Sequence, residues 1–266
     1  MRRVIILGAG GRDLHVFNTY FRHNPEYRVV AVAQVQIPGI GGKRYIKGSG
    51  GDLYQPGGVP LIGLGNLEDL SRLIRDLGGA DEVILAYSDL LYNDVGRIIS
   101  IVLANGASFR ILGPRDTMIR SSRPMLGVVA TRTGAGKSTV SHEVTLELIR
   151  RGLRVASIRH PMIYMNPDDM LVQVFKTRED LMKITFEERE EYEHYIEIGV
   201  PVLAGVDYEM ILNEAEAMAD VILWDGGNND FPFYYTDYLI TVTDARRPGH
   251  EVGSFPGEVN TRLADA

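Results

Sequence analysis

The sequence predicts an α/β protein with mostly parallel sheets, divided into two domains. Short runs rich in β-branched residues alternate with longer helical patterns along almost the whole chain, as in parallel α/β sheets. A polar segment near residue 120 separates two such series. The length, 266 residues, exceeds an average single domain and suits two. The two domains are expected to span residues 1–122 and 123–266.

In the first series, four apolar runs predict strands: Arg3–Leu7, Val29–Ala33, Glu82–Ala86 and Ser108–Leu112. Apolar residues three and four apart predict three helices between them: Leu14–Arg22, Leu67–Leu77 and Asp89–Ala104. The tract Gln36–Pro60 holds eight glycines and three prolines, so it is predicted to be a long loop. Residues 113–124 form the break between the domains.

In the second series, five runs predict strands: Met125–Thr131, Arg154–Arg159, Val200–Ala204, Asp220–Trp224 and Tyr238–Thr243. Helices are predicted over Lys137–Arg151, Phe186–Ile198 and Tyr208–Met218.

Composition excludes several classes of protein. The chain has no cysteine, which rules out disulfides and thiolate metal sites. Its net charge of −7 and pI near 5.4 disfavour a nucleic-acid binder with a broad basic face. The apolar run Val4–Leu7 is too short for a signal peptide, and no run of 18 apolar residues predicts a membrane helix. We therefore expect a cytoplasmic protein, with no nucleic-acid or membrane partner; a homodimer is compatible with these features.

The strongest motif is the sequence TRTGAGKST at residues 131–139, where a predicted strand meets a predicted helix. Glycines let backbone N–H groups surround phosphate oxygens, and the helix N-terminus adds partial positive charge. In such a phosphate loop the lysine contacts the β- and γ-phosphates and the serine hydroxyl binds Mg²⁺. The predicted nucleotide-binding residues are Thr133, Gly134, Ala135, Gly136, Lys137, Ser138 and Thr139.

One position departs from the usual phosphate-loop pattern, because Thr131 stands where the first glycine is expected. The variant loop K-G-G-x-G-K-[ST] matches better and places Arg132 at its first, signature lysine. Arg132 and Lys137 are therefore predicted to act in catalysis. The alternative is a glycine-rich strand–helix turn that arose by chance.

A carboxylate is predicted to complete this site. Asp225 ends the strand predicted over Asp220–Trp224 and is followed by Gly226 and Gly227. A carboxylate at that end of a strand beside a phosphate loop can hold Mg²⁺ or orient a nucleophile. Asp225 is therefore a predicted catalytic residue and, with Ser138, a predicted metal ligand. The alternative is that Asp225 only caps the strand.

Several cations are candidate ligands for an anionic substrate. Arg159 and His160 follow the strand predicted next to the phosphate loop, and Arg247 follows the last strand. Each has an ordinary surface loop as its alternative. The acidic run Glu187–Glu193 is expected to be a solvated helix face, with a catalytic carboxylate as the less favoured interpretation. His15, His23 and His142 lack metal-ligand spacing and are expected to be packing or surface residues.

The N-terminal loop at residues 8–13 does not fit a dinucleotide site. Its pattern G-x-G-x-x-G fails at Asp13, and no acidic residue follows about 20 positions on. Gly10, Gly11 and Arg12 remain candidates for binding a substrate phosphate. Lys43 and Arg44 are expected to close over the same anion.

Seven motifs together resemble the cyclic 2,3-diphosphoglycerate synthetase family, many of whose members are labelled predicted GTPases. They are LGAGGRD (7–13), QIPGI (36–40), ATRTGAGKS (130–138), RHPM (159–162), EEREEYE (187–193), WDGGNND (224–230) and RPGH (247–250). The resemblance covers essentially the whole chain. It implies a Rossmann-like N-terminal domain and a phosphate-loop NTPase domain, followed in the family by a C-terminal part that these 266 residues lack.

The resemblance implies a Mg²⁺-dependent phosphoryl-transfer enzyme in which ATP drives phosphoanhydride formation on a small phosphorylated metabolite. The cations available for that substrate are Arg12, Lys43, Arg44, Arg159, His160 and Arg247. The sequence contains no Asn-Lys-x-Asp motif, the motif that recognises guanine, so the choice between ATP and GTP stays open.

Two other functions stay open. One is a GTPase switch or chaperone-like nucleotide-binding protein without a small-molecule substrate. That function predicts an exposed apolar patch near residues 225–235, where four aromatic residues lie. The other is a fragment without catalytic activity.

Overall fold

The computed structural model describes residues 1–8, 11–34, 43–45, 54, 57–160, 166–226 and 230–266. It confirms a mixed α/β architecture whose sheets are mostly parallel. The chain forms two compact units. Unit 1 comprises Met1–Thr117 with Ile163–Leu171, and unit 2 comprises Met118–Met162 with Val172–Ala266. Within unit 1, the 3₁₀ turn η2 (Pro167–Asp169) contacts strand β3 (Arg44–Tyr45).

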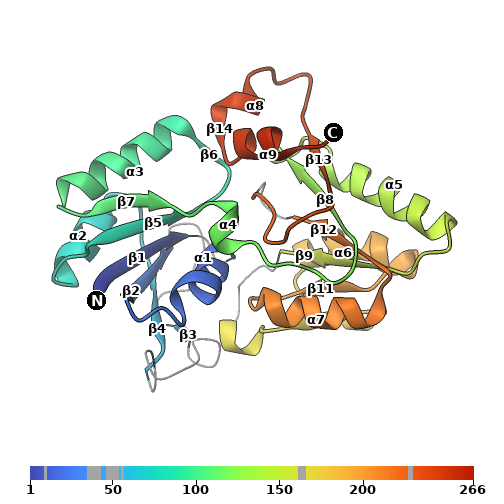
Figure 1. Ribbon diagram of the computed structural model, residues 1–266, viewed down its shortest axis with the longest axis horizontal. Coiled ribbons are helices and arrows are strands. Elements are labelled where there is room, and N and C mark those ends of the chain that lie inside the picture. The colour runs from blue at the N-terminus through green and yellow to red at the C-terminus, as the bar shows by residue number, and fades with distance from the viewer. Residues whose placement is uncertain (9–10, 35–42, 46–53, 55–56, 161–165, 227–229) are drawn as a thin grey trace. The chain divides into compact units, whose positions relative to one another are not determined.

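Unit 1 is a six-stranded sheet in the order β3-β4-β2-β1-β5-β7 (Figure 1). Its strands are β1 (Arg2–Gly8), β2 (Tyr27–Gln34), β3 (Arg44–Tyr45), β4 (Val59–Gly63), β5 (Glu82–Ala86) and β7 (Ser108–Ile111). The two-residue strand β6 (Leu90–Leu91) lies outside this sheet. Its helices are α1 (Arg12–Val16), the π-helical turn η1 (Phe17–Phe21), α2 (Asp69–Asp76), α3 (Tyr92–Ala104) and α4 (Pro114–Thr117). All pairs in the sheet are parallel except β3 with β4.

The strand order of unit 1 separates its helices into two layers. Along the chain, β2, β3 and β4 are added on one side of β1, and β5 and β7 are added on its other side. Right-handed crossovers in these two directions place the connecting helices on opposite faces of the sheet. Helices α2 and α3 contact each other on one side, and α1 with η1 and α4 covers the other. The central strands β1 and β5 are buried between these layers.

The junction of β1 and α1 is closed by a buried carboxylate. The side chain of Asp13 is fully buried and accepts hydrogen bonds from Gln34 Nε2 (2.5 Å) and the N–H of Leu14 (2.9 Å). Gly8 makes room for it, since a Cβ at residue 8 would lie 2.3 Å from Asp13 Cβ. Asp13 therefore occupies the space that a larger residue at position 8 would fill.

Unit 2 is a six-stranded sheet in the order β10-β11-β9-β12-β8-β13. Its strands are β8 (Met125–Ala130), β9 (Val155–Arg159), β10 (Gln173–Phe175), β11 (Val202–Ala204), β12 (Val221–Asp225) and β13 (Tyr238–Val242); β14 (Ser254–Phe255) lies outside the sheet. Its helices are α5 (Lys137–Arg150), the 3₁₀ turn η3 (Asp180–Lys183), α6 (Phe186–Glu197), α7 (Tyr208–Met218), α8 (His250–Gly253) and α9 (Gly257–Leu263). Only the edge strand β10 is antiparallel to its neighbour among the described pairs of this sheet.

The sheet of unit 2 has a hydrophobic core on each face. Side chains alternate along β8, so Val128 packs on one face while Met125 and Val129 pack on the other. The first face is covered by α5 and α6, and the second by α7 with the aromatic residues Trp224 and Phe233. The carboxyl ends of the parallel strands meet at one edge, where ligand sites of open α/β sheets lie.

The predicted helices and strands are all present, with ends within a few residues of their expected positions. Three parts of the prediction were wrong, and several short elements were not predicted, among them the edge strand β10. Most of the expected loop Gln36–Pro60 lies outside the described residues, but its described part contains β3 and the first residues of β4. Pro60 is tolerated because pairing of β4 with β2 begins only at Leu61. The helix expected over Leu14–Arg22 begins at Arg12 and becomes π-helical after Val16.

The third difference is the segment after β13, for which no element was predicted. There α8, β14 and α9 pack behind the end of β8: Ser254 Oγ donates to the carbonyl of Thr131 (2.9 Å) and Asn260 Nδ2 to that of Ala130 (3.1 Å). These helices are short and carry weak apolar periodicity, so their position depends on contacts with distant residues rather than on local sequence.

Among the described residues, no helix has the length and apolar character needed to cross a membrane.

The packing at Gly8 generates a stability prediction. Gly8→Ala is expected to lower the free energy of unfolding by about 1–3 kcal/mol, because the added methyl group overlaps the Asp13 side chain. Gly96→Ala is the matched control: it lies in α3 with open space around it, so alanine should stabilise the helix by about 0.5–1 kcal/mol. Urea denaturation of the two variants measures both changes. Equal effects of the two substitutions would contradict the packing.

Candidate functional site

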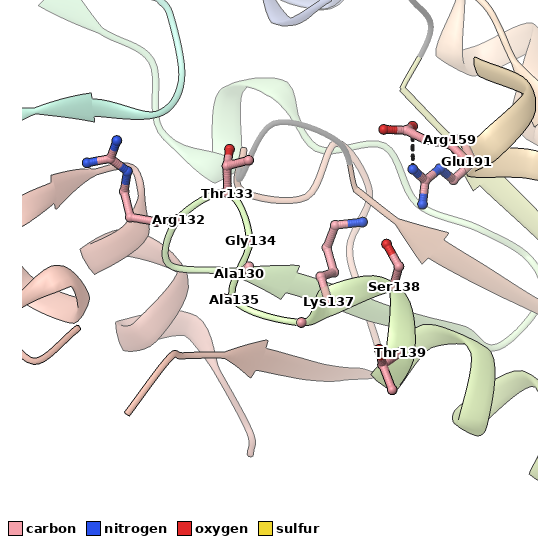
Figure 2. A pocket seen from close by; sticks show the side chains of 11 residues that line it. Ala130, Arg132, Thr133, Gly134, Ala135, Lys137, Ser138, Thr139, Arg159 and Glu191 are labelled. Atoms are coloured by element: carbon pink, nitrogen blue, oxygen red, sulfur yellow. Dashed lines mark hydrogen bonds and ion pairs between the residues drawn. The ribbon is translucent and has the colours of Figure 1, made fainter. Parts of the chain in front are cut away.

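The glycine loop (residues 131–136) connects β8 to α5 and encloses one side of a cavity of about 300 Å³ (Figure 2). Gly134 and Gly136 have φ values of +80° and +102°, a backbone region that favours glycine. Gly136 is the N-cap of α5, and Lys137 is its first residue. Glycine at these two positions therefore allows the turn that carries the chain from β8 around the cavity into α5.

Every residue that the sequence predicted to bind nucleotide lines this cavity. The lining residues are Ala130, Arg132, Thr133, Gly134, Ala135, Gly136, Lys137, Ser138, Thr139, Arg159 and Glu191. In Figure 2, Lys137 and Ser138 point toward the side that carries Arg159 and Glu191, and the Arg132 side chain extends from the other side of the loop. The structure thus brings Lys137, Ser138 and Arg159 together and places Arg132 apart from them.

Asp225 lies beneath the cavity and is fully buried. Its Oδ1 accepts hydrogen bonds from Lys137 Nζ (2.5 Å) and Ser141 Oγ (2.9 Å). Its Oδ2 accepts from Arg159 Nη1 and from Tyr195 Oη (2.8 Å). A carboxylate offers about four lone-pair sites, so four donors saturate it.

The fold explains why these four donors meet at one carboxylate. In the parallel pairing of β12 with β9, Asp225 stands opposite Arg159, and strand alternation turns both side chains toward the α5–α6 face. Lys137 and Ser141 are four residues apart on α5 and therefore share one side of that helix. Tyr195 reaches the same point from α6.

Ion pairing keeps Asp225 charged. Burial alone raises the pKa of a carboxyl group, but the charges of Arg159 and Lys137 outweigh burial and hold the pKa of Asp225 well below its usual range. Burial and the neighbouring carboxylate raise the pKa of Tyr195, which therefore stays a proton donor to Asp225 at neutral pH. The site is a saturated ionic network rather than an isolated carboxylate.

Arg159 joins two carboxylates. Its side chain is 2% exposed; besides Asp225 it contacts Glu191 Oε2 through Nη2 at 2.5 Å. Both anions neutralise it, so its charge is already balanced inside the protein. The predicted role of Arg159 in binding an anionic substrate would therefore have to compete with two internal carboxylates.

Glu191 is the cavity residue that the sequence analysis did not single out. The run Glu187–Glu193 was expected to be a solvated helix face, and for three of its members that expectation was wrong. Glu188 is buried and forms a capping box with Thr185, Tyr192 is buried in the core, and Glu191 lines the cavity. Sequence periodicity gave a signal, because Glu188, Tyr192 and Tyr195 repeat at helical spacing and Glu191 lies next to that stripe.

A pair of histidines lies beside this network. The rings of His142 on α5 and His194 on α6 have centroids 5.5 Å apart, and the His194 ring lies 4.1 Å from that of Tyr195. Burial and the charge of Arg159 lower the pKa of His194 to about 4. His142 was expected to be a packing or surface residue, and its contact with His194 agrees with packing.

Thr131 does not disturb the loop, although it replaces a glycine of the usual pattern. It is buried, and its N–H donates to the carbonyl of Val242 (3.0 Å) as part of the strand pairing. A Cβ at Gly257 would lie 2.2 Å from the Thr131 carbonyl, so α9 approaches this residue closely. The open part of the loop accordingly begins at Arg132.

Two other predicted substrate residues of unit 2 lie near the cavity without lining it. Arg247 donates from Nη1 to the carbonyl of Thr133 (3.1 Å) and pairs with Asp244 (3.4 Å). The ring of His160 packs 5.4 Å from that of Phe233. Arg247 therefore supports the glycine loop from outside, and His160 belongs to an aromatic contact.

In unit 1, the predicted phosphate ligands are described in part. Gly10 lies outside the described residues. The Gly11 carbonyl accepts the N–H of His15 at the start of α1, and Arg12 is buried, with 4% exposed. Arg44 donates to the carbonyls of Gly57 and Gly58. The side chain of Asp13 in this loop is also fully buried.

The residues around the glycine loop fit a magnesium nucleotide. Mg²⁺ in such sites keeps several waters and takes one or two protein oxygens with the phosphates, and the Ser138 hydroxyl lines the cavity. Asp225 can assist only after one of its four donors leaves. No cluster of three or more His, Asp or Glu side chains able to hold a metal ion occurs among the residues that the structure describes.

Two curated proteins with synthetase names are similar to this chain. Arginine synthetase ArcE of Thermococcus kodakarensis is 52% identical over 99% of this chain and 58% of its own length. Cyclic 2,3-diphosphoglycerate synthetase of Thermococcus gammatolerans is 27% identical over 78% of this chain and 53% of its own length. The chain thus spans a little over half the length of these relatives. No protein-family model matches it.

Among solved structures, LpxK from Aquifex aeolicus in complex with ATP is 16% identical, with a TM-score of 0.43 over 65% of this chain and 54% of LpxK. The sequence comparison thus finds the expected similarity to a cyclic 2,3-diphosphoglycerate synthetase. The sequence identity to arginine synthetase ArcE is much higher, 52% against 27%.

The network around Asp225 generates a stability prediction. Asp225→Asn is expected to lower the free energy of unfolding by about 3 kcal/mol or more, because it leaves the buried charge of Lys137 uncompensated. The matched control is Asp220→Asn, which removes a solvent-exposed pair with Arg154 and should have a far smaller effect. Chemical denaturation compares the two, and equal losses would show that the Asp225 network is not tightly coupled.

His194 generates a pH prediction. Its pKa is about 4 in the folded protein and ordinarily 6.5, so between these values the unfolded chain binds a proton that the folded protein excludes. Stability is therefore expected to fall as pH falls from 6.5 to 4. His194→Gln should flatten this decline, as measured by urea denaturation at intervals across that range. Identical pH dependence in wild type and variant would refute the assignment.

Proposed function

We propose that this chain forms the nucleotide-binding part of a Mg²⁺-dependent synthetase that transfers the γ-phosphoryl group of ATP or GTP to a small molecule. The observation that carries the proposal is the glycine loop, whose two left-handed glycines precede Lys137 and Ser138 at the mouth of the cavity. That arrangement matches a phosphate loop. The synthetase names of both relatives support a ligase or kinase reaction.

In this proposal Lys137 changes partner when nucleotide binds. In the structure its Nζ donates to Asp225 Oδ1 (2.5 Å), and in the proposed complex it contacts the β- and γ-phosphates instead. Asp225 then keeps Arg159, Tyr195 and Ser141 as donors. Ser138, with Asp225 close by, would hold Mg²⁺, and that ion would supply neutralisation of the phosphate charge. Backbone N–H groups of the glycine loop orient the γ-phosphoryl group for in-line attack.

The acceptor is proposed to be a small metabolite. The relatives' names give two classes of product, arginine and cyclic 2,3-diphosphoglycerate, so the acceptor is proposed to be a precursor of one of these classes, with the product as a second ligand of the same site. Our initial expectation was a phosphorylated anion, bound by Arg159 among others. Because Arg159 is neutralised and Glu191 faces the cavity with a side chain 40% exposed, the described part of the site favours an acceptor that donates hydrogen bonds over one with several phosphates.

For the organisation of the chain, we propose that residues 1–122 form a Rossmann-like domain and 123–266 a phosphate-loop NTPase domain. The parallel strands of unit 1 support this, because their order matches the 3-2-1-4-5 pattern of doubly wound folds.

The switch alternative loses its main support. It predicted an exposed apolar patch near residues 225–235, but Phe231, Phe233 and Tyr234 are buried. Phe233 and Tyr234 pack against Trp224 and Tyr208 in the α7-side core. These three aromatic side chains therefore belong to the interior and do not form an exposed surface for a partner.

Nucleotide binding is tested by thermal denaturation with ATP or GTP and Mg²⁺. A triphosphate at 100 times its Kd should stabilise the wild type by about 2.7 kcal/mol. Lys137→Ala is expected to lose most of this stabilisation, because the phosphates lose their main cation. Lys183→Ala removes an exposed lysine and is the matched control, which should respond as the wild type does. No response of the wild type to either triphosphate would overturn the proposed function.

The same assay with a triphosphate present tests the acceptor. Arginine and 2,3-diphosphoglycerate are added separately, and further stabilisation by arginine alone is expected. Stabilisation by 2,3-diphosphoglycerate alone would contradict the preference for a hydrogen-bond donor and restore the anionic acceptor.

A further inference from the structure

Glu191 is the one carboxylate among the described residues that line the cavity. It lies on the side toward which Lys137 and Ser138 point (Figure 2). Only its Oε2 is bound, by Arg159 Nη2, and the side chain is 40% exposed. Oε1 therefore faces the cavity side and has space to accept a further hydrogen bond.

Asp225 cannot accept a hydrogen bond or a proton from a molecule in the cavity, as Glu191 can. It is fully buried, all its lone-pair sites are occupied, and it does not line the cavity. Protonating it would also leave the buried Arg159 facing a neutral partner at this position. A proton released in the cavity has Glu191 as its available carboxylate acceptor.

Glu191 is held firmly enough to position a reacting group. Helix α6 begins with a capping box between Thr185 and Glu188, and Tyr192 and Tyr195 anchor its next turn in the core. The planar guanidinium of Arg159, fixed by Asp225, holds Oε2 and so sets the orientation of the carboxylate. Arg159 is thus a positioning residue that connects Asp225 to Glu191.

We propose that Glu191 orients the attacking nucleophile and accepts its proton during phosphoryl transfer; this inference rests on the proposed function. The nucleophile's O–H or N–H donates to Oε1 as its lone pair attacks the γ-phosphorus. The new bond to phosphorus forms while the bond from the γ-phosphorus to the β–γ bridging oxygen breaks, and the electron pair leaves with the nucleoside diphosphate. The proton moves to Glu191 Oε1. Because the transition state is loose, the nucleophile loses its proton late, and a carboxylate already in hydrogen-bond contact with it is placed to accept that proton.

The test uses a transition-state analogue, so it does not require the acceptor to be known. The whole chain is titrated with Mg²⁺ and aluminium fluoride plus ADP or GDP, according to which triphosphate stabilises the wild type. Such an analogue holds an in-line nucleophile, usually water, and is expected to bind the wild type at least about 100-fold more tightly than the diphosphate alone. Glu191→Gln should lose roughly tenfold or more of this enhancement.

Two comparisons distinguish a role of Glu191 in orienting the nucleophile from a general effect on folding. Glutamine keeps an oxygen for Arg159, so Glu191→Gln should retain the wild-type Tm and triphosphate affinity. Glu190→Gln, which alters an exposed neighbour on α6, is the matched control and should retain the full enhancement. If Glu191→Gln does not fold, Glu191→Asp shortens the side chain by one methylene and is expected to lose part of the enhancement.

The outcomes distinguish the two proposals. A wild type that binds no nucleotide removes the proposed function and this inference with it. A wild type that binds triphosphate but shows no analogue enhancement, or a Glu191→Gln variant with the full enhancement, overturns the role of Glu191 alone.

Discussion

The candidate site depends on how one buried carboxylate is balanced. Asp225 has no contact with water, and an isolated charge in that position would be too costly to retain. Arg159 and Lys137 supply the opposite charge, and Ser141 and Tyr195 supply two neutral donors. Buried ion pairs of this kind contribute little net stability when compared with apolar packing. Their contribution here is to fix where each side chain lies around the cavity.

The two cations that pair with Asp225 differ in exposure. Arg159 lies between Asp225 and Glu191 and is as deeply buried as Asp225, whereas Lys137 lies at the cavity edge, with 12% of its side chain exposed. If Lys137 moves to a phosphate, Arg159 alone still neutralises Asp225. The same arginine orients Glu191, so the phosphate-binding and acceptor sides of the cavity share one structural support.

Sequence patterns predicted most of the regular elements and the position of the glycine loop between β8 and α5, because strand and helix periodicity and the G-x-G-K-S spacing are local features. They did not predict α9, which depends on contacts of Asn260 and Ser254 with the end of β8. Arg159 and Asp225 were identified as separate candidates, but their pairing follows from the β9–β12 register, which the sequence does not state. Glu191 was missed because a run of glutamates has the same local pattern whether one of them lines a cavity or not.

On binding nucleotide, Lys137 is proposed to exchange Asp225 for phosphate oxygens. A crystal structure with Mg²⁺ and a non-hydrolysable ATP or GTP analogue tests it most directly. The predicted result is a contact between Lys137 Nζ and phosphate oxygens, with Asp225 still bound by Arg159, Tyr195 and Ser141. A structure in which Lys137 stays on Asp225 while the phosphates bind elsewhere would contradict the account.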